Sequence, residues 1–380
     1  MKKRFVSLLV ALSITLTFLP MGAVAAPTNE IIQGNLKYTV NNYTVNDDGE
    51  SVTVSGTSES TSEKPTQLNI ESSILYNGTN YTVTKIATWA FNACNTLTEV
   101  TLPNTVDEIE YQAFFNCSNL TKVIIPEGVR KIGQAAFYGC SQLTSITIPS
   151  TITNMDTAFS GNTALSHVTL TNGISNISSM AFKGCTGLTE IKVPISVDEI
   201  CPGAFNGCTG LTSVTLEKGI NIINSNAFKD CTELNDVKYN GYKTDWEKVR
   251  VNKAGNDTLT SKVQYLCDIN FDLNGGTING SGTMDKQTVY SNEKLGTASV
   301  PTTPPQRTGY DFDGWYTQAE GGTKYTFTEA VSSNITLYAH WNAHSHTVTL
   351  ENDENKKTNS YDYGSSVSVP TPTKKTGYNF

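Results

Sequence analysis

Three side chains with the chemistry of a catalytic triad stand at nearly equal intervals: Ser145, His167 and Glu190 lie 22 and 23 residues apart. Their types and order fit a nucleophile, a general base and a group that orients the base. However, they occupy one equivalent position of successive repeat units, where a strand spacing of about 4.8 Å would hold their side chains parallel. No pocket or oxyanion hole is evident beside them, so we predict no catalytic residues and no enzyme activity.

Two acidic pairs also invite a chemical interpretation. Asp107-Glu108 and Asp198-Glu199 both occur within Val-Asp-Glu-Ile, and a glycosidase needs two carboxylates about 5–9.5 Å apart. The pairs are 91 residues apart, which is four repeat units and about 19 Å at the spacing of stacked strands. We interpret them as surface charges, with Lys131 one unit after Glu108 to form ion pairs of small energy.

Metal and cofactor chemistry has little support. Three of the four histidines, His340, His344 and His346, fall within seven residues, and imidazole binds zinc or copper. They straddle the end of one module and a linker, so no scaffold or supporting partner fixes their geometry. Gly275-Gly276 is too short for a dinucleotide-binding loop. We therefore expect no metal site and no cofactor.

Eight cysteines in a secreted chain would ordinarily indicate disulfides. Six of them occupy one position of the repeat unit: Cys94, Cys117, Cys140, Cys185, Cys208 and Cys231. Side chains that share one inward direction do not meet the geometry of a bridge. We predict that these six are reduced and serve as small buried hydrophobic side chains.

The elements that position these residues form a repeat with a period of 23 residues and one interval of 22. An Ala-Phe pair ends at Phe91, Phe114, Phe137, Phe159, Phe182, Phe205 and Phe228. Each unit, which we call a rung, reads A-F-x-x-C-x-x-L-x-x-V-x-L-P-x-x-V-x-x-I. A fixed period of this length predicts a solenoid. The alternation of Val100 and Leu102 predicts a short strand, which Pro103 ends because it has no ladder donor.

We therefore predict a mainly β fold with short helical turns, in which about seven stacked rungs share one core. The seven phenylalanines and the six repeat cysteines are the predicted structural core. The fourth rung departs from the pattern, with Asn162 in place of cysteine and Thr171 in place of proline. These departures affect the packing of that rung and leave the fold class unchanged.

The first 25 residues have the features of a secretory signal peptide, with a basic head, an apolar run from Phe5 to Leu19 and Ala23-Val24-Ala25 at the end. Removing them changes the formal net charge from −8 to −11. An acidic, secreted chain is poorly suited to bind nucleic acid or anionic membrane surfaces. We expect a secreted protein without membrane insertion after signal cleavage.

The repeat pattern resembles the BspA-like, or treponemal-type, leucine-rich repeats. The resemblance assigns repeats to residues 68–236, and the segment "VKYNGYKTDWEKVRVNKAGNDTLTSKVQY" is similar to the C-terminal cap of that family, which we place at residues 237–267. Alternating residues in "LKYTVNNYTV" and "SVTVSG" predict strands that cover the other end, within residues 26–67.

A second type of module follows the cap. Gly309-Tyr310, Gly314-Trp315-Tyr316, Gly321-Gly322-Thr323 and Leu337-Tyr338-Ala339 resemble the internalin-type B-repeat, or Listeria–Bacteroides repeat. This resemblance implies a small β-grasp module at residues 268–342 that acts as a spacer. Residues 343–380 are interpreted as the start of a second, truncated B-repeat, which we expect not to form a stable domain by itself.

A ligand is expected to bind to the outward side of the longer strands, because stacking constrains only the buried positions. Two columns of side chains form this hypothetical ligand-binding surface. The first column is Glu99, Lys122, Ser145, His167, Glu190, Ser213 and Asp236, and the second is Thr101, Ile124, Thr147, Thr169, Lys192, Thr215 and Lys238. Charge reversal at Lys192 and Lys238 is expected to weaken attachment.

The resemblance and the repeat together favour a binding or adhesion protein whose partners are host or bacterial surface proteins or glycans. Two other functions remain open. The chain is either the targeting region of a larger secreted hydrolase, or a purely structural surface component without a specific ligand. Sequence downstream of Phe380 would distinguish the hydrolase, and a binding array would distinguish the structural component.

Overall fold

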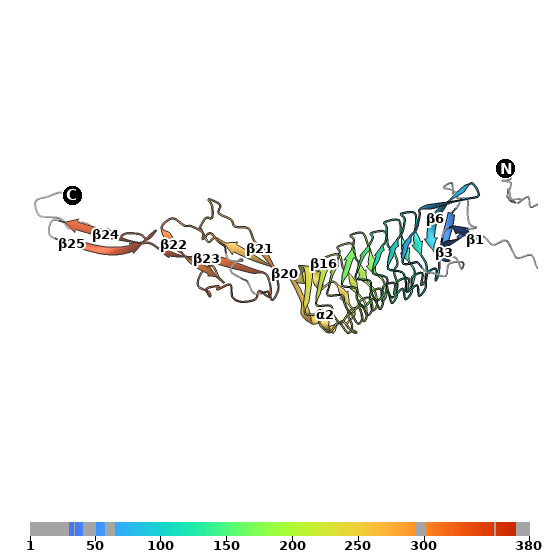
Figure 1. Cartoon of the computed structure of the whole chain (residues 1–380). Coiled ribbons are helices and arrows are strands. Elements are labelled where there is room, and N and C mark those ends of the chain that lie inside the picture. The colour runs from blue at the N-terminus through green and yellow to red at the C-terminus, as the bar shows by residue number, and fades with distance from the viewer. Residues whose placement is uncertain are drawn as a thin grey trace, which may run out of the picture.

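The computed structural model describes residues 30–33, 35–40, 51–57, 65–293, 301–352 and 355–369. The predicted signal peptide lies outside these residues. The described part is almost entirely strands and turns, with two short helices. It forms an elongated arrangement in which the solenoid, a small β module and a two-stranded hairpin follow one another (Figure 1). Within the described residues, no helix is long and apolar enough to cross a membrane.

Each rung contributes a longer strand and, in most rungs, a short strand. The longer strands are β4 (Gln67–Asn69), β7 (Glu99–Thr101), β9 (Lys122–Ile124), β11 (Ser145–Ile148), β12 (His167–Leu170), β14 (Glu190–Val193), β16 (Ser213–Glu217) and β18 (Asp236–Tyr242). The short strands are β8 (Glu108–Ile109), β10 (Lys131–Ile132), β13 (Asn176–Ile177), β15 (Glu199–Ile200), β17 (Ile222–Ile223) and β19 (Arg250–Val251). Paired rungs are parallel and in register, so Ser213 lies beside Asp236. The predicted mainly β solenoid is confirmed.

The Ala-Phe segments are hydrogen-bonded turns. In the first rung, Asn92 N donates to Trp89 O at 3.1 Å, and Phe91 N donates to Ala113 O of the next rung at 2.8 Å. Trp89 and Ala93 both have left-handed backbone conformations, with φ of 57° and 51°. A left-handed residue interrupts a right-handed helix, so the predicted helical turn extends no further than one turn. Cross-rung hydrogen bonds then continue the stack.

Two columns of side chains fill the interior. The seven repeat phenylalanines are buried and stack in parallel, with consecutive ring centroids 5.1–5.7 Å apart. The six repeat cysteines are buried, and the structure shows no disulfide among them. From the second rung onward each cysteine donates its Sγ hydrogen to the carbonyl of the preceding rung's phenylalanine, as Cys185 does to Phe159 O at 3.2 Å. The thiols therefore provide hydrogen-bond donors for buried backbone carbonyl groups of the phenylalanines.

The fourth rung breaks this second column. Asn162 is fully buried, and neither its Oδ1 nor its Nδ2 has a hydrogen-bond partner. Phe159 of the same rung nevertheless stacks on both neighbouring rings, at 5.5 and 5.7 Å. The fold thus continues through the rung, while a buried amide without partners destabilises it by about 1–3 kcal/mol.

The N-terminal end of the solenoid is covered by additional strands: β1 (Glu30–Gln33), β2 (Leu36–Val40), β3 (Ser51–Thr57), β5 (Ser73–Tyr76) and β6 (Thr79–Ile86). They extend the row of short strands in the order β1-β2-β3-β6-β8-β10. Val52 and Val54 of β3 are fully buried and belong to the same core as the rungs. The apolar face of the first rung is therefore closed off from water.

The C-terminal end is closed by α1 (Lys243–Trp246), α2 (Asp257–Lys262) and the start of β20 (Val263–Asp272). In earlier rungs the phenylalanine N–H donates to the alanine carbonyl of the next rung. For Phe228 the buried side chain of Asn256 takes the place of that carbonyl, accepting the N–H at 3.0 Å. Trp246 packs edge-on against Tyr239 at 5.3 Å. This cap thus gives the Phe228 N–H a partner at the end of the repeat.

β20 runs through the predicted boundary between Cys267 and Asp268 and belongs to both modules. It pairs with β18 of the solenoid and with β21 (Gln287–Tyr290) and β23 (Ile335–Ala343) of the B-repeat. Asp268 is 8% exposed and accepts hydrogen bonds from Lys286, Thr288 and Tyr242 at 2.6, 2.8 and 2.9 Å. A shared strand and a buried carboxylate therefore join the two modules rigidly.

The B-repeat has its own core, in which Trp315 of β22 (Tyr310–Tyr316) contacts Phe271 edge-on at 4.8 Å. Beyond it, β24 (Ser345–Asn352) and β25 (Asn355–Asp362) form an antiparallel hairpin. Among residues 344–369, no side chain for which the structure gives exposure is buried. The hairpin therefore lacks a core of its own among these residues, and the expectation that residues 343–380 do not form a stable domain stays a prediction.

Candidate functional site

The outward side of the longer strands, which we call the strand face, carries the fourteen residues of the two predicted columns. All fourteen are exposed or half-buried, while the side chains between them point into the core. Parallel register places equivalent residues of paired rungs side by side, as with Lys192 and Thr215. The strand face is therefore a continuous surface whose composition changes from rung to rung.

The hydrogen-bonded ladder of this face is open at two places. The strand order falls into β4-β7-β9, then β11-β12, then a sheet that starts with β14. Within the described residues, β12 and β14 are adjacent but not paired. Val168 at the centre of β12 is only partly buried, whereas its six equivalents in the other rungs are buried. The opening thus leaves Val168, which packs against the core, partly accessible at the floor of the strand face.

A hollow of ≈ 300 Å³ lies over this opening. Its floor includes Val168 and Ile191, and its rim is formed by His167, Thr169, Glu190, Lys192, Ser213 and Thr215. An apolar floor with a polar rim is the arrangement found at the energetically important centre of protein interfaces. Six residues of the predicted columns meet here, from three successive rungs.

Charges of both signs alternate along the strand face. Lys122 pairs with Glu99 of the preceding rung, and Lys192 lies 3.6 Å from Glu217. Ser213 Oγ donates to Asp236 Oδ2 at 3.2 Å. Exposed pairs of this kind contribute little to stability, so their side chains remain available to a partner.

The triad arrangement considered from the sequence does not form. Ser145 and His167 are register partners on β11 and β12, but the His167 ring makes its hydrogen bond with Ser166 Oγ, at 2.8 Å from Nδ1. Glu190 belongs to a different sheet from His167. The strand spacing keeps the three side chains parallel instead of directing them toward one reacting atom.

Lys238, the last residue of the second column, serves the joint to the B-repeat. Its Nζ lies 3.4 Å from Glu293 Oε1 and 5.0 Å from the ring centre of Tyr290. Charge reversal there would place a carboxylate beside Glu293 and Asp236. A loss of attachment after Lys238→Glu would therefore not identify a ligand contact, and Lys192 is the better position for that test.

The acidic pair around Glu108 forms the expected surface ladder. Glu108 accepts hydrogen bonds from Lys131 at 2.6 Å and Lys85 at 2.8 Å. Burial raises the pKa of Glu108, but the hydrogen bonds from the two lysines outweigh this, and the net pKa lies below its ordinary value. The hydrogen bond that Lys85 donates to Glu108 raises the pKa of Lys85 in turn. These contacts account for the pair without any catalytic role.

The three clustered histidines separate in the structure. His340 stacks on Tyr316 with ring centres 3.9 Å apart, His344 Nε2 lies 2.9 Å from Asp311 Oδ1, and His346 lies beside Tyr363. Among the described residues, no group of three potential metal ligands is close enough to hold an ion.

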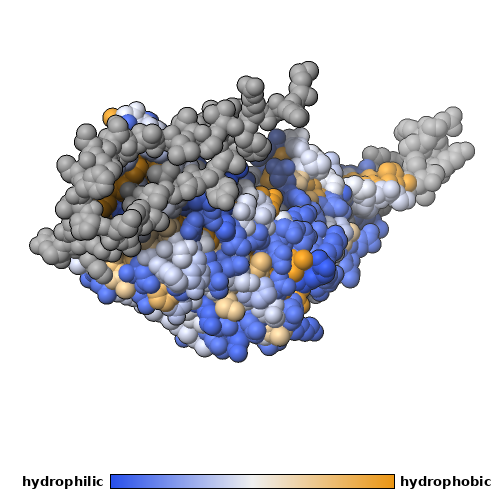
Figure 2. Space-filling view, turned by 90° about the vertical axis from the view of Figure 1, so that its right-hand side faces the viewer, coloured by the Kyte–Doolittle hydropathy of each residue, from blue (hydrophilic) through white to orange (hydrophobic). Residues whose placement is uncertain are grey.

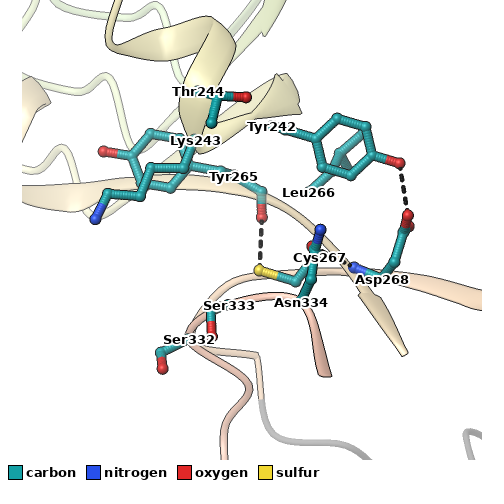
Figure 3. A pocket seen from close by; sticks show the side chains of 10 residues that line it. All are labelled: Tyr242, Lys243, Thr244, Tyr265, Leu266, Cys267, Asp268, Ser332, Ser333 and Asn334. Atoms are coloured by element: carbon teal, nitrogen blue, oxygen red, sulfur yellow. Dashed lines mark hydrogen bonds between the residues drawn. The ribbon is translucent and has the colours of Figure 1, made fainter. Parts of the chain in front are cut away.

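A larger hollow, of ≈ 590 Å³, lies at the joint between the cap and the B-repeat (Figure 3). Several of its polar groups bond to one another. Tyr242 donates to Asp268, Asp268 N donates to Asn334 Oδ1 at 2.9 Å, and Cys267 Sγ lies 3.9 Å from Tyr265 O. These contacts hold the joint together, and they leave the strand face as the stronger candidate for ligand recognition.

The surface seen in Figure 2 is mostly hydrophilic, with small and separate apolar areas outside the grey residues. Sequence reasoning identified the rim of the strand-face hollow but not its floor, because Val168 has the same pattern position as six buried residues. It also overlooked four aromatic residues in the first three turns. The sequence shows them within two residues of the core Ala-Phe pairs, as Trp89, Tyr111, Phe115 and Tyr138.

Family models and relatives agree with this architecture. The model described as BspA type leucine rich repeat region matches residues 68–157 and 155–248, and the model described as Listeria-Bacteroides repeat domain matches residues 268–340. Internalin H of Listeria monocytogenes is 35% identical over 101 residues, which cover 26% of this chain and 18% of internalin H. A protein of Evansella cellulosilytica described as a Gly-rich membrane protein is 29% identical over 134 residues, 34% of this chain and 14% of that protein.

This chain thus spans less than a fifth of the length of these two relatives. A leucine-rich repeat protein of Bacteroides ovatus, known from a crystal structure, is 26% identical with a TM-score of 0.42, over 58% of this chain and 66% of that one. Neither matching family description names an enzymatic activity. The chain therefore carries BspA-type leucine-rich repeats over residues 68–248, followed by a Listeria–Bacteroides repeat domain over residues 268–340.

Proposed function

We propose that this chain is a secreted or surface-displayed bacterial adhesion protein whose strand face binds a surface protein. The observation that carries the proposal is the hollow between β12 and β14, where the partly buried Val168 lies beneath a rim of six variable polar residues. Such a site can hold one apolar anchor of a partner while the rim charges select its orientation.

The B-repeat is proposed to act as a spacer. β20 continues from the solenoid into this module, and the buried Asp268 network locks the joint. A rigid spacer keeps the strand face at a constant distance and orientation from whatever follows it. Rigidity also lowers the entropy lost when several copies bind one surface.

Matched lysine substitutions provide the test. Lys192→Glu reverses a charge on the rim of the hollow, and Lys183→Glu makes the same change in an exposed turn outside the strand face. Both proteins are applied to an array of purified cell-surface and extracellular-matrix proteins at physiological salt. We expect binding of the parent protein to at least one surface protein, weakened about tenfold by Lys192→Glu and unchanged by Lys183→Glu. Equal binding by both variants would contradict the assignment of the strand face.

A further inference from the structure

A second surface of the solenoid, outside the strand face, is formed by the first three Ala-Phe turns. We call it the turn platform, and it comprises residues 88–96, 111–119 and 134–142. Cross-rung hydrogen bonds hold the turns side by side, as from Trp89 N to Tyr111 O at 3.2 Å and from Asn116 N to Tyr138 O at 2.7 Å. The platform is therefore a fixed surface.

Besides the three buried repeat phenylalanines, four aromatic residues lie on this platform. Trp89, Tyr111 and Tyr138 are 57%, 40% and 39% exposed, and Phe115 is half-buried. Trp89 and Tyr111 form one edge-on pair with ring centres 6.1 Å apart, and Phe115 and Tyr138 form one parallel pair at 5.1 Å. Tyr and Trp are enriched at interfaces, and exposed apolar side chains grouped in one place mark interaction sites.

Gln112 connects the two aromatic pairs. Its Oε1 accepts a hydrogen bond from Trp89 Nε1 at 2.7 Å, and its backbone carbonyl accepts one from Phe115 N at 3.1 Å. The fold does not require tryptophan at position 89. The backbone there is left-handed, with φ of 57°, and the seventh rung places Asn226 at the equivalent position with φ of 58°. A bulky side chain is disfavoured in this conformation, so stability alone does not explain Trp89.

The platform carries no formal charge. Its 27 residues contain no Asp, Glu, Lys or Arg, although the chain average of 16% would place about four there. The adjacent Glu110 directs its carboxylate to Thr88, whose N and Oγ1 both lie 3.0 Å from Oε2. Exposed amides at Asn92, Asn116 and Gln134 surround the rings and offer both hydrogen-bond donors and acceptors. Charged residues return in later turns at Asp156, Lys183 and Lys229.

We propose that the turn platform binds a neutral polysaccharide. The C–H faces of sugar rings pack on exposed aromatic rings, and their hydroxyl groups pair with side-chain amides, whereas a charged polymer would find no counter-charge on the platform. The extended row of three turns suits a chain of several sugars. This site is separate from the strand face, so the inference does not depend on the proposed protein partner.

The test uses residues that the chain itself places at equivalent positions. The double variant Trp89→Asn with Tyr138→Asn copies Asn226 at the first position, and Asn92 and Asn206 at the second. The variant Trp89→Tyr with Tyr138→Trp keeps an aromatic ring at both positions. The probes are gels containing linear β-glucan, xylan, mannan or α-glucan, and alginate gels as an anionic comparison. Thermal unfolding establishes that each variant is folded.

We expect a neutral polysaccharide to retard the parent protein, with affinity about tenfold or more weaker in the double asparagine variant. The ring-preserving variant and Lys192→Glu should both bind normally. Trp89 is the most exposed of the four tryptophans, so bound sugar should protect tryptophan fluorescence from acrylamide quenching. The proposal is overturned by retardation in alginate alone, by no retardation in any neutral gel, or by equal binding of the asparagine variant. If the parent protein binds no glycan and the double asparagine variant loses a protein partner, the platform would be assigned to protein binding instead.

Discussion

The interior and the strand face are built from the same rungs but follow opposite rules. Inside, the same aromatic ring recurs seven times, with centroid separations that vary only between 5.1 and 5.7 Å. Outside, the first column changes from Glu99 to Lys122, Ser145 and His167 in successive rungs. Each interior side chain must fit a copy of itself above and below, whereas an outward side chain meets water or a partner. The comparison separates the residues that specify the fold from those that can specify a ligand.

The largest expected effect concerns the interior thiols. Burial raises the pKa of Cys185 and Cys231 to about 12, so alkylation of the native protein at pH 8 should be about a thousandfold slower than that of an exposed thiol. After unfolding without reductant, mass spectrometry should show eight labels. Fewer than six labels would require a disulfide that involves the cysteine column and would contradict the reduced interior.

The next largest effect is expected on stability, when one ring is removed from the phenylalanine column. Phe159→Ala leaves a cavity between two stacked rings and should destabilise the solenoid by about 3–5 kcal/mol in urea unfolding. Lys183→Glu on the surface is the control and should change stability by less than about 0.5 kcal/mol. A loss below about 1 kcal/mol for Phe159→Ala would mean that the rungs do not depend on the continuous column.

The fourth rung offers a change in the opposite direction. Asn162→Cys removes two buried polar atoms without partners and places a thiol where its equivalents donate to the preceding phenylalanine carbonyl, here that of Phe137. We expect a gain of about 1–3 kcal/mol in the free energy of unfolding. The reverse change, Cys185→Asn, should destabilise by a similar amount. If Asn162→Cys is neutral or destabilising, the buried amide of Asn162 stabilises the fold in a way that stacking of identical side chains does not explain.

The smallest effect is expected at the ion pairs of Glu108. Its pKa is lowered in the folded protein, so its contribution is present above the ordinary glutamate pKa and is lost as pH falls through the lowered value. Glu108→Gln should lose about 0.5–1 kcal/mol at pH 7 and progressively less as the pH falls below the ordinary glutamate pKa. The exposed carboxylate of Glu233 provides the control, as Glu233→Gln. A pH-independent difference would show that packing, and not charge, is responsible.

The period of the Ala-Phe pairs was sufficient to predict the solenoid, because identical spacing allows identical side chains to stack. The outward columns followed from strand alternation. The opening between β12 and β14 did not, because pairing between rungs depends on the relative positions of two backbones, and His167–Leu170 has the same apolar pattern as fully paired strands. The shared strand β20 was also missed. The two family resemblances assign its first residues to the solenoid cap and its last residues to the B-repeat, but one continuous strand pairs with both modules.

The central claim is that a partner binds in the hollow between β12 and β14, and a removable steric block tests it most directly. Thr169→Cys places an accessible thiol on the rim of the hollow, and Lys183→Cys places one outside the strand face, while the interior thiols stay protected. Each native protein is modified with a bulky disulfide-forming reagent and tested for binding to the surface protein identified on the array. We predict that the block at position 169 abolishes binding, that a reductant restores it, and that the block at position 183 has no effect. Undiminished binding with position 169 blocked would contradict the claim.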